Sequence, residues 1–421
     1  MLPPLRIMPR DAVPPEKRLS RDSILLLIVH ALFQLGSSMA GVFLNLYLWR
    51  LTHSLWISGM YSAIAVALSP VGFALAGWAA KKRHPLFPYR LGILLSAGFY
   101  LAVVLLQERV VELYPLFAVC SGLVSGCYWI GYLVLTYDVT TETNRLRYLG
   151  INTVTFTFAG LVGPVLAGWI ISRSGGLAGY VLTFAIAFLT FAGSAAVTYG
   201  MQGRRSGHRT YFLRSMPRLI RKRPDWTLSL LGFLVMGLLQ GVMLFLPNLL
   251  LFQAVGREDS VGYLGVVLSL TAMAAGYGQS RWSKPGMHRL LMLICAIGVT
   301  AGSLLLLGRF GLPTVLGFLV LYNFFSPLQG NVLSSYYYTM INRLPLKGQL
   351  KIESIVMREV FLDVGRVLST LVTIGAASSM TGRTMTYMLL GLALTQFALP
   401  LCMEREKRTE PKERPERGLR G

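Results

Sequence analysis

Four charged side chains lie within residues 358–366, in the sequence Arg358-Glu359-Val-Phe-Leu-Asp363-Val-Gly-Arg366, inside an apolar stretch long enough to cross a bilayer. A single charge at the bilayer centre costs about 2.5–3.5 kcal/mol on insertion scales, so charges within a span usually face the protein interior and line a path for a solute or for protons. Because a helix turns by about 100° per residue, Glu359, Asp363 and Arg366 share one narrow face, which we expect to point inward.

Asp363 is the strongest candidate for proton coupling. It lies about ten residues past Glu353, or roughly 15 Å along a helix, at a depth where a carboxylate loses contact with water. Such a group can bind a proton in one conformation and release it in another, with Glu359 and Arg366 as its partners. The alternative is a static network in which Arg358 and Arg366 neutralise the two acids.

A second polar face lies near the start of the chain, where His30, Gln34 and Asn45 recur at helical spacing. We expect this face to line a cavity and His30 to carry a proton, because histidine titrates near neutral pH; a histidine that is simply hydrogen-bonded is the alternative. Further candidates for substrate contact are polar or aromatic residues within apolar segments: Tyr128, Tyr132, Gln240, Asn248, Asn323, Gln329 and Asn331. The amides fit packing between helices equally well, whereas Tyr137 and residues 336–338 fit an interfacial aromatic belt.

The composition is that of a membrane protein. The chain has 421 residues, of which 54% are hydrophobic and 14% charged, and its mean hydropathy is +0.56, unlike a soluble domain. A membrane-spanning helix needs about 20 mainly apolar residues. We predict twelve such helices, at 24–49, 55–79, 91–107, 114–137, 149–172, 178–200, 226–252, 260–279, 289–308, 311–341, 354–380 and 384–403.

The formal net charge of +22 is explained by topology. With the N-terminus in the cytoplasm, 32 of the 40 Lys and Arg residues fall in tails and loops on the cytoplasmic side and six on the opposite side, as the positive-inside rule predicts. We therefore expect a multi-pass protein of the cell membrane with both termini cytoplasmic, whose basic loops contact anionic headgroups and not nucleic acid. The first span has some features of a signal peptide, but its apolar run continues unbroken through Leu48.

An internal repeat divides the chain. The segment from Asn144 to Gly150, Asn-Arg-Leu-Arg-Tyr-Leu-Gly, recurs 198 positions later as Asn-Arg-Leu-Pro-Leu-Lys-Gly, from Asn342 to Gly348. Parallel repeats of this kind place the substrate at their interface near the membrane midplane. The predicted organisation is a cytoplasmic tail at 1–22, six-helix bundles at 23–200 and 226–403, a basic cytoplasmic linker at 201–225, and a disordered tail at 404–421.

This organisation resembles the major facilitator superfamily over nearly the whole chain. The resemblance implies an all-α fold of two pseudo-symmetric six-helix bundles. The sequence Gly160-Leu-Val-Gly163-Pro164-Val-Leu-Ala167-Gly168 is similar to the glycine–proline pattern of the superfamily's exporters, although Ala167 replaces a glycine; its residues allow close helix contact and bending, which implies a gating role. The whole combination most resembles a poorly characterised bacterial branch known as YqgE-like.

The loop between the second and third helices departs from the family pattern. The family has a glycine, an acid and then bases, and uses their charge pairs to latch the cytoplasmic gate; here the sequence Gly77-Trp-Ala-Ala-Lys-Lys-Arg83 keeps the glycine and the bases but lacks the acid. We expect Asp138 to replace that acid, and an exposed cap of little energetic value is the alternative. Its expected partners are Lys81, Lys82, Arg83 and Arg145.

The residues together predict a secondary transporter that works by alternating access, with proton-coupled export of a small amphipathic compound. The alternatives are proton-coupled uptake, flipping of a lipid or lipid-linked substrate, a transporter-like sensor or assembly factor, and a membrane-embedded enzyme such as a lipid transferase. We expect a monomer without enzymatic activity, cofactor or metal, because catalytic signatures are absent and the cysteines are not placed for a metal site or a disulfide. These cysteines are Cys120, Cys127, Cys295 and Cys402.

Overall fold

The computed structural model describes residues 14–52, 55–174, 178–202, 210–243, 246–255, 258–282, 286–308, 311–346, 349–376 and 382–403. Within these residues the fold is all-α, as predicted. Helices satisfy their backbone hydrogen bonds internally, which a lipid environment requires.

The first half of the chain forms six helices whose bounds follow the predicted spans closely. Pro70 and Pro164 lie inside helices, where each removes one backbone donor. The helices are α1 (Arg21–Thr52), α2 (Leu55–Lys82), α3 (Leu86–Leu106), α4 (Tyr114–Val139), α5 (Arg145–Ser174) and α6 (Ala178–Thr198).

The second half begins after α7 (Met216–Lys222), a short helix of the linker. The predicted span at 226–252 corresponds to two helices, α8 (Pro224–Met243) and α9 (Leu246–Val255), with Pro247 in the first turn of α9. The remaining helices are α10 (Glu258–Trp282), α11 (His288–Leu305), α12 (Leu312–Asn342), α13 (Lys351–Ala376) and α14 (Gly382–Thr395).

Helix length and exposure identify a multi-pass membrane protein. Among the described residues, eight helices are long and apolar enough to cross a membrane. Large apolar side chains are exposed on the outside, including Leu105 (73%), Trp169 (58%) and Leu371 (61%). Such exposure is unfavourable in water but suits a surface in contact with lipid.

The same pattern of neighbouring helices recurs in the two halves. In the first half α1 packs on α5 and α6, α3 packs on α4 and α6, and α2 packs on α4. In the second half α8 packs on α13 and α14, α11 packs on α12 and α14, and α10 packs on α12.

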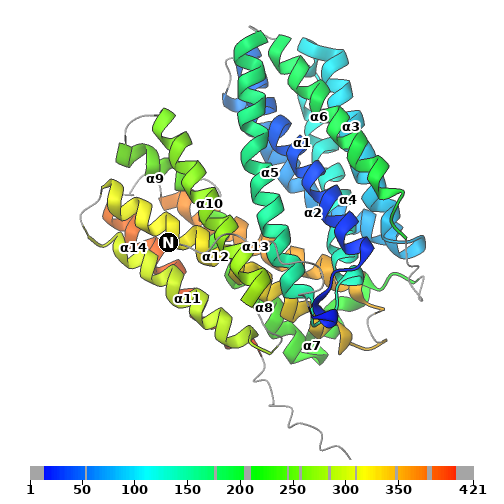
Figure 1. Ribbon diagram of the computed structural model, residues 1–421, viewed down its shortest axis with the longest axis vertical. Coiled ribbons are helices and arrows are strands. Elements are labelled where there is room, and N and C mark those ends of the chain that lie inside the picture. Colours follow the sequence, from blue (N-terminus) through cyan, green and yellow to red (C-terminus); the bar gives the residue numbers. More distant parts are fainter. Residues whose placement is uncertain are drawn as a thin grey trace, which may run out of the picture.

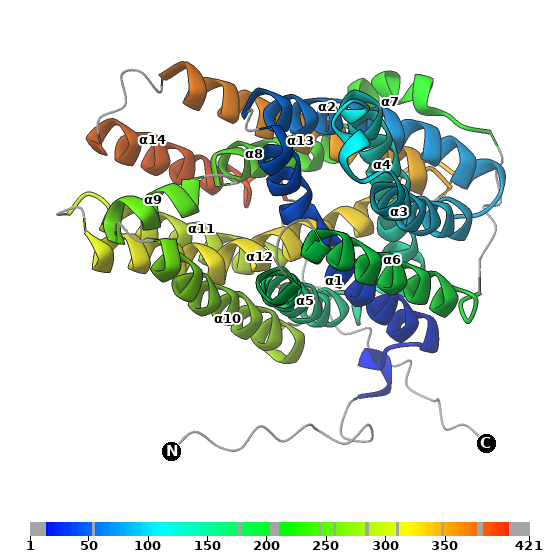
Figure 2. The ribbon, with the colours of Figure 1, turned by 90° about the horizontal axis from the view of Figure 1, so that it is seen from above.

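The halves meet through α2 and α4 against α13, and through α5 against α10 and α12 (Figure 2). The two bundles join near the end of the molecule that carries α7 and diverge toward the opposite end (Figure 1). We call the joined end the latched end.

Candidate functional site

The first contact across the latched end is a buried ion pair between α2 and α13. Lys81 Nζ lies 3.1 Å from Glu353 Oε1, and both side chains are 0% exposed. Lys81 also donates to the carbonyl of Gln349, and the backbone N–H of Phe212, in the linker, donates to Glu353 Oε1 at 3.0 Å. These additional hydrogen bonds offset the loss of water around the two charges.

A second ion pair lies at the same end, between Asp138 of α4 and Lys351 of α13. The partners expected from the sequence were Lys81, Lys82, Arg83 and Arg145. The structure differs because the first turn of α13 packs against both α2 and α4 and supplies one charge of each sign. Lys81 is thereby paired with Glu353, while Arg83 is exposed and its guanidinium lies 4.1 Å from the ring centre of Phe87. We call the Lys81–Glu353 and Asp138–Lys351 pairs the latch.

Arg145 also lies at this interface, with 2% of its surface exposed. Its guanidinium carbon is 5.3 Å from the ring centre of Tyr338 on α12, and the Tyr338 hydroxyl donates to the carbonyl of Leu133 on α4 at 3.0 Å. The prediction of an aromatic belt at residues 336–338 is wrong, because these three tyrosines are buried at 7%, 0% and 1% exposure. The hydroxyls of Tyr337 and Tyr338 donate to backbone carbonyls inside the protein and do not face headgroups.

Two glycines allow α5 and α10 to touch backbone to backbone. A Cβ added at Gly150 would lie 2.5 Å from the carbonyl oxygen of Gly276 and 2.7 Å from the amide nitrogen of Ser280. These atoms belong to helix backbones, so the clash could be relieved only by separating the halves.

We expect Gly150→Leu to prevent closure of the latched end. Ile352, in the first turn of α13, is 0% exposed and lies 3.4 Å from the Cβ position of Gly77 on α2, so a cysteine there reports opening by its reaction with a maleimide. On a background in which the four native cysteines are replaced, Gly150→Leu combined with Ile352→Cys should be labelled much faster than Ile352→Cys alone. The matched control is Gly98→Leu, since no atom lies within 4 Å of a Cβ at Gly98; equal labelling in both leucine variants would contradict the prediction.

Asn331 of α12, a candidate substrate contact, lies between the halves. Its amide nitrogen donates to Thr153 Oγ1 of α5 at 2.9 Å and to Gln279 Oε1 of α10 at 2.6 Å. It therefore joins three helices in this conformation, in line with the packing alternative.

The charged face of α13 separates into two ion pairs. Arg358 Nη2 lies 2.6 Å from Glu359 Oε1, and both side chains are nearly buried, at 9% and 12% exposure. One turn further on, Arg366 Nη1 donates to Asp363 Oδ1 at 3.0 Å, with side-chain exposures of 33% and 30%. Asp363 is thus the more accessible of the two carboxylates.

The Asp363–Arg366 pair faces other helices. Arg366 Nη2 donates to Gln240 Oε1 of α8 at 2.8 Å. The exposed apolar residues Val364 and Leu371 lie more than about 100° around α13 from Arg366. The pair is therefore turned toward the helix bundle, as its sequence predicts, and the lipid-facing side of α13 is apolar.

His30 of α1 lies inside an aromatic box formed with Tyr128, Trp129, Tyr132 and Phe156. Its Nδ1 is 2.5 Å from the Tyr128 hydroxyl, and its ring centre is 3.9 Å from that of Tyr132, stacked nearly parallel. His30, Tyr128 and Tyr132 are 1%, 0% and 4% exposed. In this conformation these side chains form a closed cluster within the first half.

The other predicted residues are distributed along the helices. Gln34 is half-buried, 3.6 Å from the Cβ position of Gly160, and Asn323 Nδ2 donates to the carbonyl of Leu319 in its own helix at 2.9 Å. Gln329 is 2% exposed. The side chains of Asn45 and Asn248 lie outside the described part of the structure.

Two of the predicted gating glycines, Gly163 and Gly77, occupy tight positions. The Cβ position of Gly163 is 3.0 Å from the Met39 backbone nitrogen of α1, beside Pro164 and the half-buried Gly168 on α5. The Cβ position of Gly77 on α2 is 2.9 Å from the Tyr211 hydroxyl of the linker. Gly77 therefore lies where α2, α13 and the linker converge.

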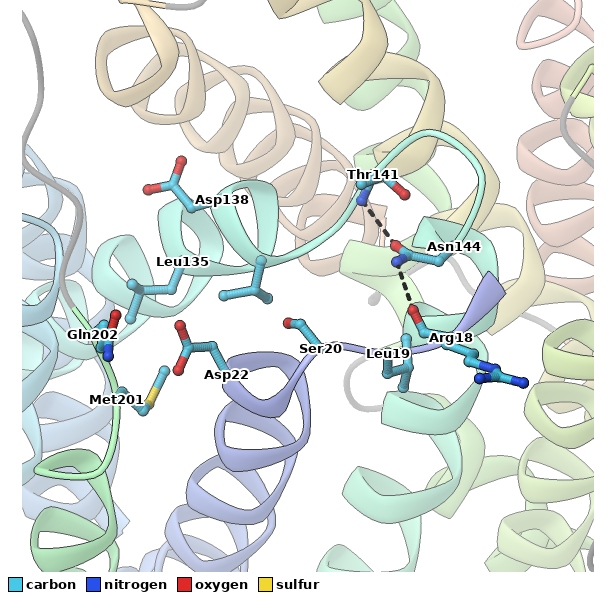
Figure 3. A pocket seen from close by; sticks show the side chains of 11 residues that line it. Arg18, Leu19, Ser20, Asp22, Leu135, Asp138, Thr141, Asn144, Met201 and Gln202 are labelled. Atoms are coloured by element: carbon cyan, nitrogen blue, oxygen red, sulfur yellow. Dashed lines mark hydrogen bonds between the residues drawn. The ribbon is translucent and has the colours of Figure 1, made fainter. Parts of the chain in front are cut away.

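A cavity of about 420 Å³ opens at the latched end. It lies between the residues that precede α1, the end of α4 and the chain after α6 (Figure 3). Asn144 closes one side by accepting from the Thr141 N–H at 2.8 Å and donating to the Arg18 carbonyl at 3.2 Å. Asp138 of the latch belongs to its wall, so the second ion pair borders an open space.

Sequence reasoning did not identify Glu353 and Lys351 as latch residues. A signal was present: the loop after the second predicted helix has bases and no acid, and Glu353 is an acid directly before the predicted helix at 354–380. The sequence does not show how the two halves are placed along their contact, because that depends on side-chain packing. Without it, the pairing of Glu353 with Lys81 could not be predicted.

The fold and the ion pairs define the class: a helical membrane protein whose two bundles are joined at one end by two ion pairs, with a charged face on one inner helix. The sequence model described as "Major Facilitator Superfamily" matches residues 26–349. The chain belongs to this superfamily. It is 28% identical over 352 residues to "Uncharacterized protein YqgE" of Bacillus subtilis (strain 168), covering 84% of this chain and 82% of that protein.

Solved structures share the fold. The human organic anion transporter MFSD10 (TETRAN) superposes with a TM-score of 0.71 at 16% identity, over 92% of this chain and all of that one. A bacterial homologue of the iron transporter ferroportin, in its outward-facing state, superposes with a TM-score of 0.70 at 13% identity, over 91% of this chain and 98% of that one.

Proposed function

We propose that the protein is a secondary active transporter that exports a small amphipathic solute in exchange for protons by alternating access. The latched end faces the cytoplasm, which the basic loops at that end support, and the termini lie on the same side. The conformation is then open toward the outside, as in the outward-facing ferroportin homologue with a similar fold.

One observation carries this proposal: α13 holds both Asp363, the accessible carboxylate, and Glu353, the latch acid. The two are ten residues apart on one unbroken helix, or about 15 Å. Protonation of Asp363 removes the charge that holds Arg366 and changes the forces between α13 and α8. Because α13 also closes the latch, the same change can alter which side is open.

Gln240 and Arg366 offer hydrogen bonds to a polar group of the solute. Tyr322 on α12 is close enough to Arg366 for an electrostatic interaction. A substrate site that combines these few polar groups with the apolar side chains of the surrounding helices would suit an amphipathic compound. The aromatic box around His30 is assigned a supporting role in the first half, with His30 able to take part in proton transfer if that box opens.

The test uses compounds that raise the melting temperature of the purified protein. We expect such a compound to accumulate in energised inverted membrane vesicles, and a protonophore to abolish its accumulation. Accumulation that is unchanged by the protonophore would contradict proton coupling, and a compound that binds but never crosses would favour a sensor.

A further inference from the structure

The linker between the halves contacts both sides of the latch. The Tyr211 hydroxyl donates to the Ala74 carbonyl of α2 at 3.2 Å, and the Phe212 N–H donates to Glu353 of α13 at 3.0 Å. Burial and the nearby Glu353 carboxylate raise the pKa of Tyr211, so its hydroxyl stays protonated and remains a donor. The latched end cannot open between α2 and α13 unless the linker releases at least one of them.

The opposite face of this segment is strongly basic. Met216 is buried, Leu219 and Ile220 are half-buried, and α7 packs on α8 and α13. Five cations around α7 are exposed, and no acid lies between them in sequence. They are Arg214, Arg218, Arg221, Lys222 and Arg223.

The position of α7 matches the headgroup layer. α8 begins two residues after α7 ends, and its first strongly exposed apolar side chains are Leu228 (43%) and Leu231 (40%). These side chains mark the edge of the hydrocarbon region, and α7 lies across the end of the bundle just beyond it (Figure 1). Each Lys or Arg near an anionic membrane surface contributes favourably to its attachment.

We infer that the five exposed cations of the linker bind anionic lipid headgroups, and that this contact holds the linker on the latch and favours the latched conformation. A ligand shifts an equilibrium by its difference in affinity for the two states. The docked linker can hydrogen-bond to Glu353 and to the Ala74 carbonyl while its cations contact the headgroups, whereas an open latch requires the linker to move. The inference does not depend on the solute or on proton coupling.

Hydrogen exchange of the full-length protein in lipid nanodiscs tests this. Replacing part of a zwitterionic lipid with phosphatidylglycerol should slow exchange in peptides covering 210–216 and 349–356 by about tenfold. The variant R214Q/R218Q/R221Q/K222Q/R223Q should lose this response. A matched control, R405Q/K407Q/R408Q/K412Q/R414Q, removes five charges from the C-terminal segment and should respond as the unmodified protein does.

Equal exchange in both lipids, or a normal response in the linker variant, would overturn the inference. An equal effect of inorganic phosphate in zwitterionic nanodiscs would also overturn it, because the ligand would then be a soluble anion. Melting temperatures of both five-charge variants in zwitterionic lipid show whether each is folded. The intermediate variant R218Q/R221Q/K222Q should show a reduced lipid response.

Discussion

Asp363→Asn should reduce proton-driven flux to the background of empty vesicles. Asparagine keeps an oxygen that can accept from Arg366, but it cannot bind and release a proton. Because the pair is about one-third exposed, solvent screens the remaining charge on Arg366, and we expect the protein to fold. Flux is measured in energised inverted vesicles with a compound identified by its thermal shift.

The matched control is Asp225→Asn. Asp225 lies exposed at the start of α8, and its replacement should leave proton-driven flux within about twofold of the unmodified protein, as for most surface substitutions. A binding measurement shows whether lost flux reflects lost proton coupling or a misfolded protein. The folded Asp363→Asn variant should still bind the compound. Proton-driven flux that survives in Asp363→Asn would exclude this carboxylate as the coupling group.

Lys81→Met should open the latched end. The substitution leaves Glu353 buried without its cation, which typically costs about 3–5 kcal/mol when a buried pair is broken. A loss of about 3 kcal/mol in the latched state alone changes the ratio of latched to open molecules by more than about 100-fold. The maleimide reaction of Ile352→Cys measures the change as a faster labelling rate.

The double substitution Lys81→Met with Glu353→Met distinguishes the effect of an unpaired buried charge from the effect of altered side-chain packing. Replacing both members of a buried pair by apolar residues is often neutral, so labelling should return toward the slow rate of the parent. Lys82→Met is the surface control, since Lys82 is exposed with its Nζ 4.1 Å from the ring centre of Trp78. Equally slow labelling in Lys81→Met and Lys82→Met would show that the ion pair does not hold the latch.

Hydropathy and charge located the helices because lipid imposes simple requirements on each segment separately. A helix must be apolar over its span, and bases must remain on one side. The charged face of α13 was predictable for the same reason: charges at this depth must turn inward, and Arg366 does so toward Gln240.

The partners across the latched end were not predictable in the same way. Whether Asp138 meets Arg145 or Lys351 depends on where α13 lies along α4. That position follows from how the two halves pack, for example where Gly150 of α5 touches Gly276 of α10. Hydropathy carries no information about such contacts. Likewise, the run of tyrosines that includes Tyr338 is typical of an interfacial aromatic belt. In the structure Tyr338 is buried where α12 meets α4.

The central claim is that the two ends of the molecule open in turn, and distances between spin labels test it most directly. One pair, Glu142→Cys and Arg343→Cys, spans the latched end, and a second pair, Glu112→Cys and Leu307→Cys, spans the opposite end; all four positions are exposed. Adding a transported compound or lowering the pH should lengthen one distance and shorten the other. If both distances stay fixed under all conditions, or change in the same direction, the protein does not work by alternating access.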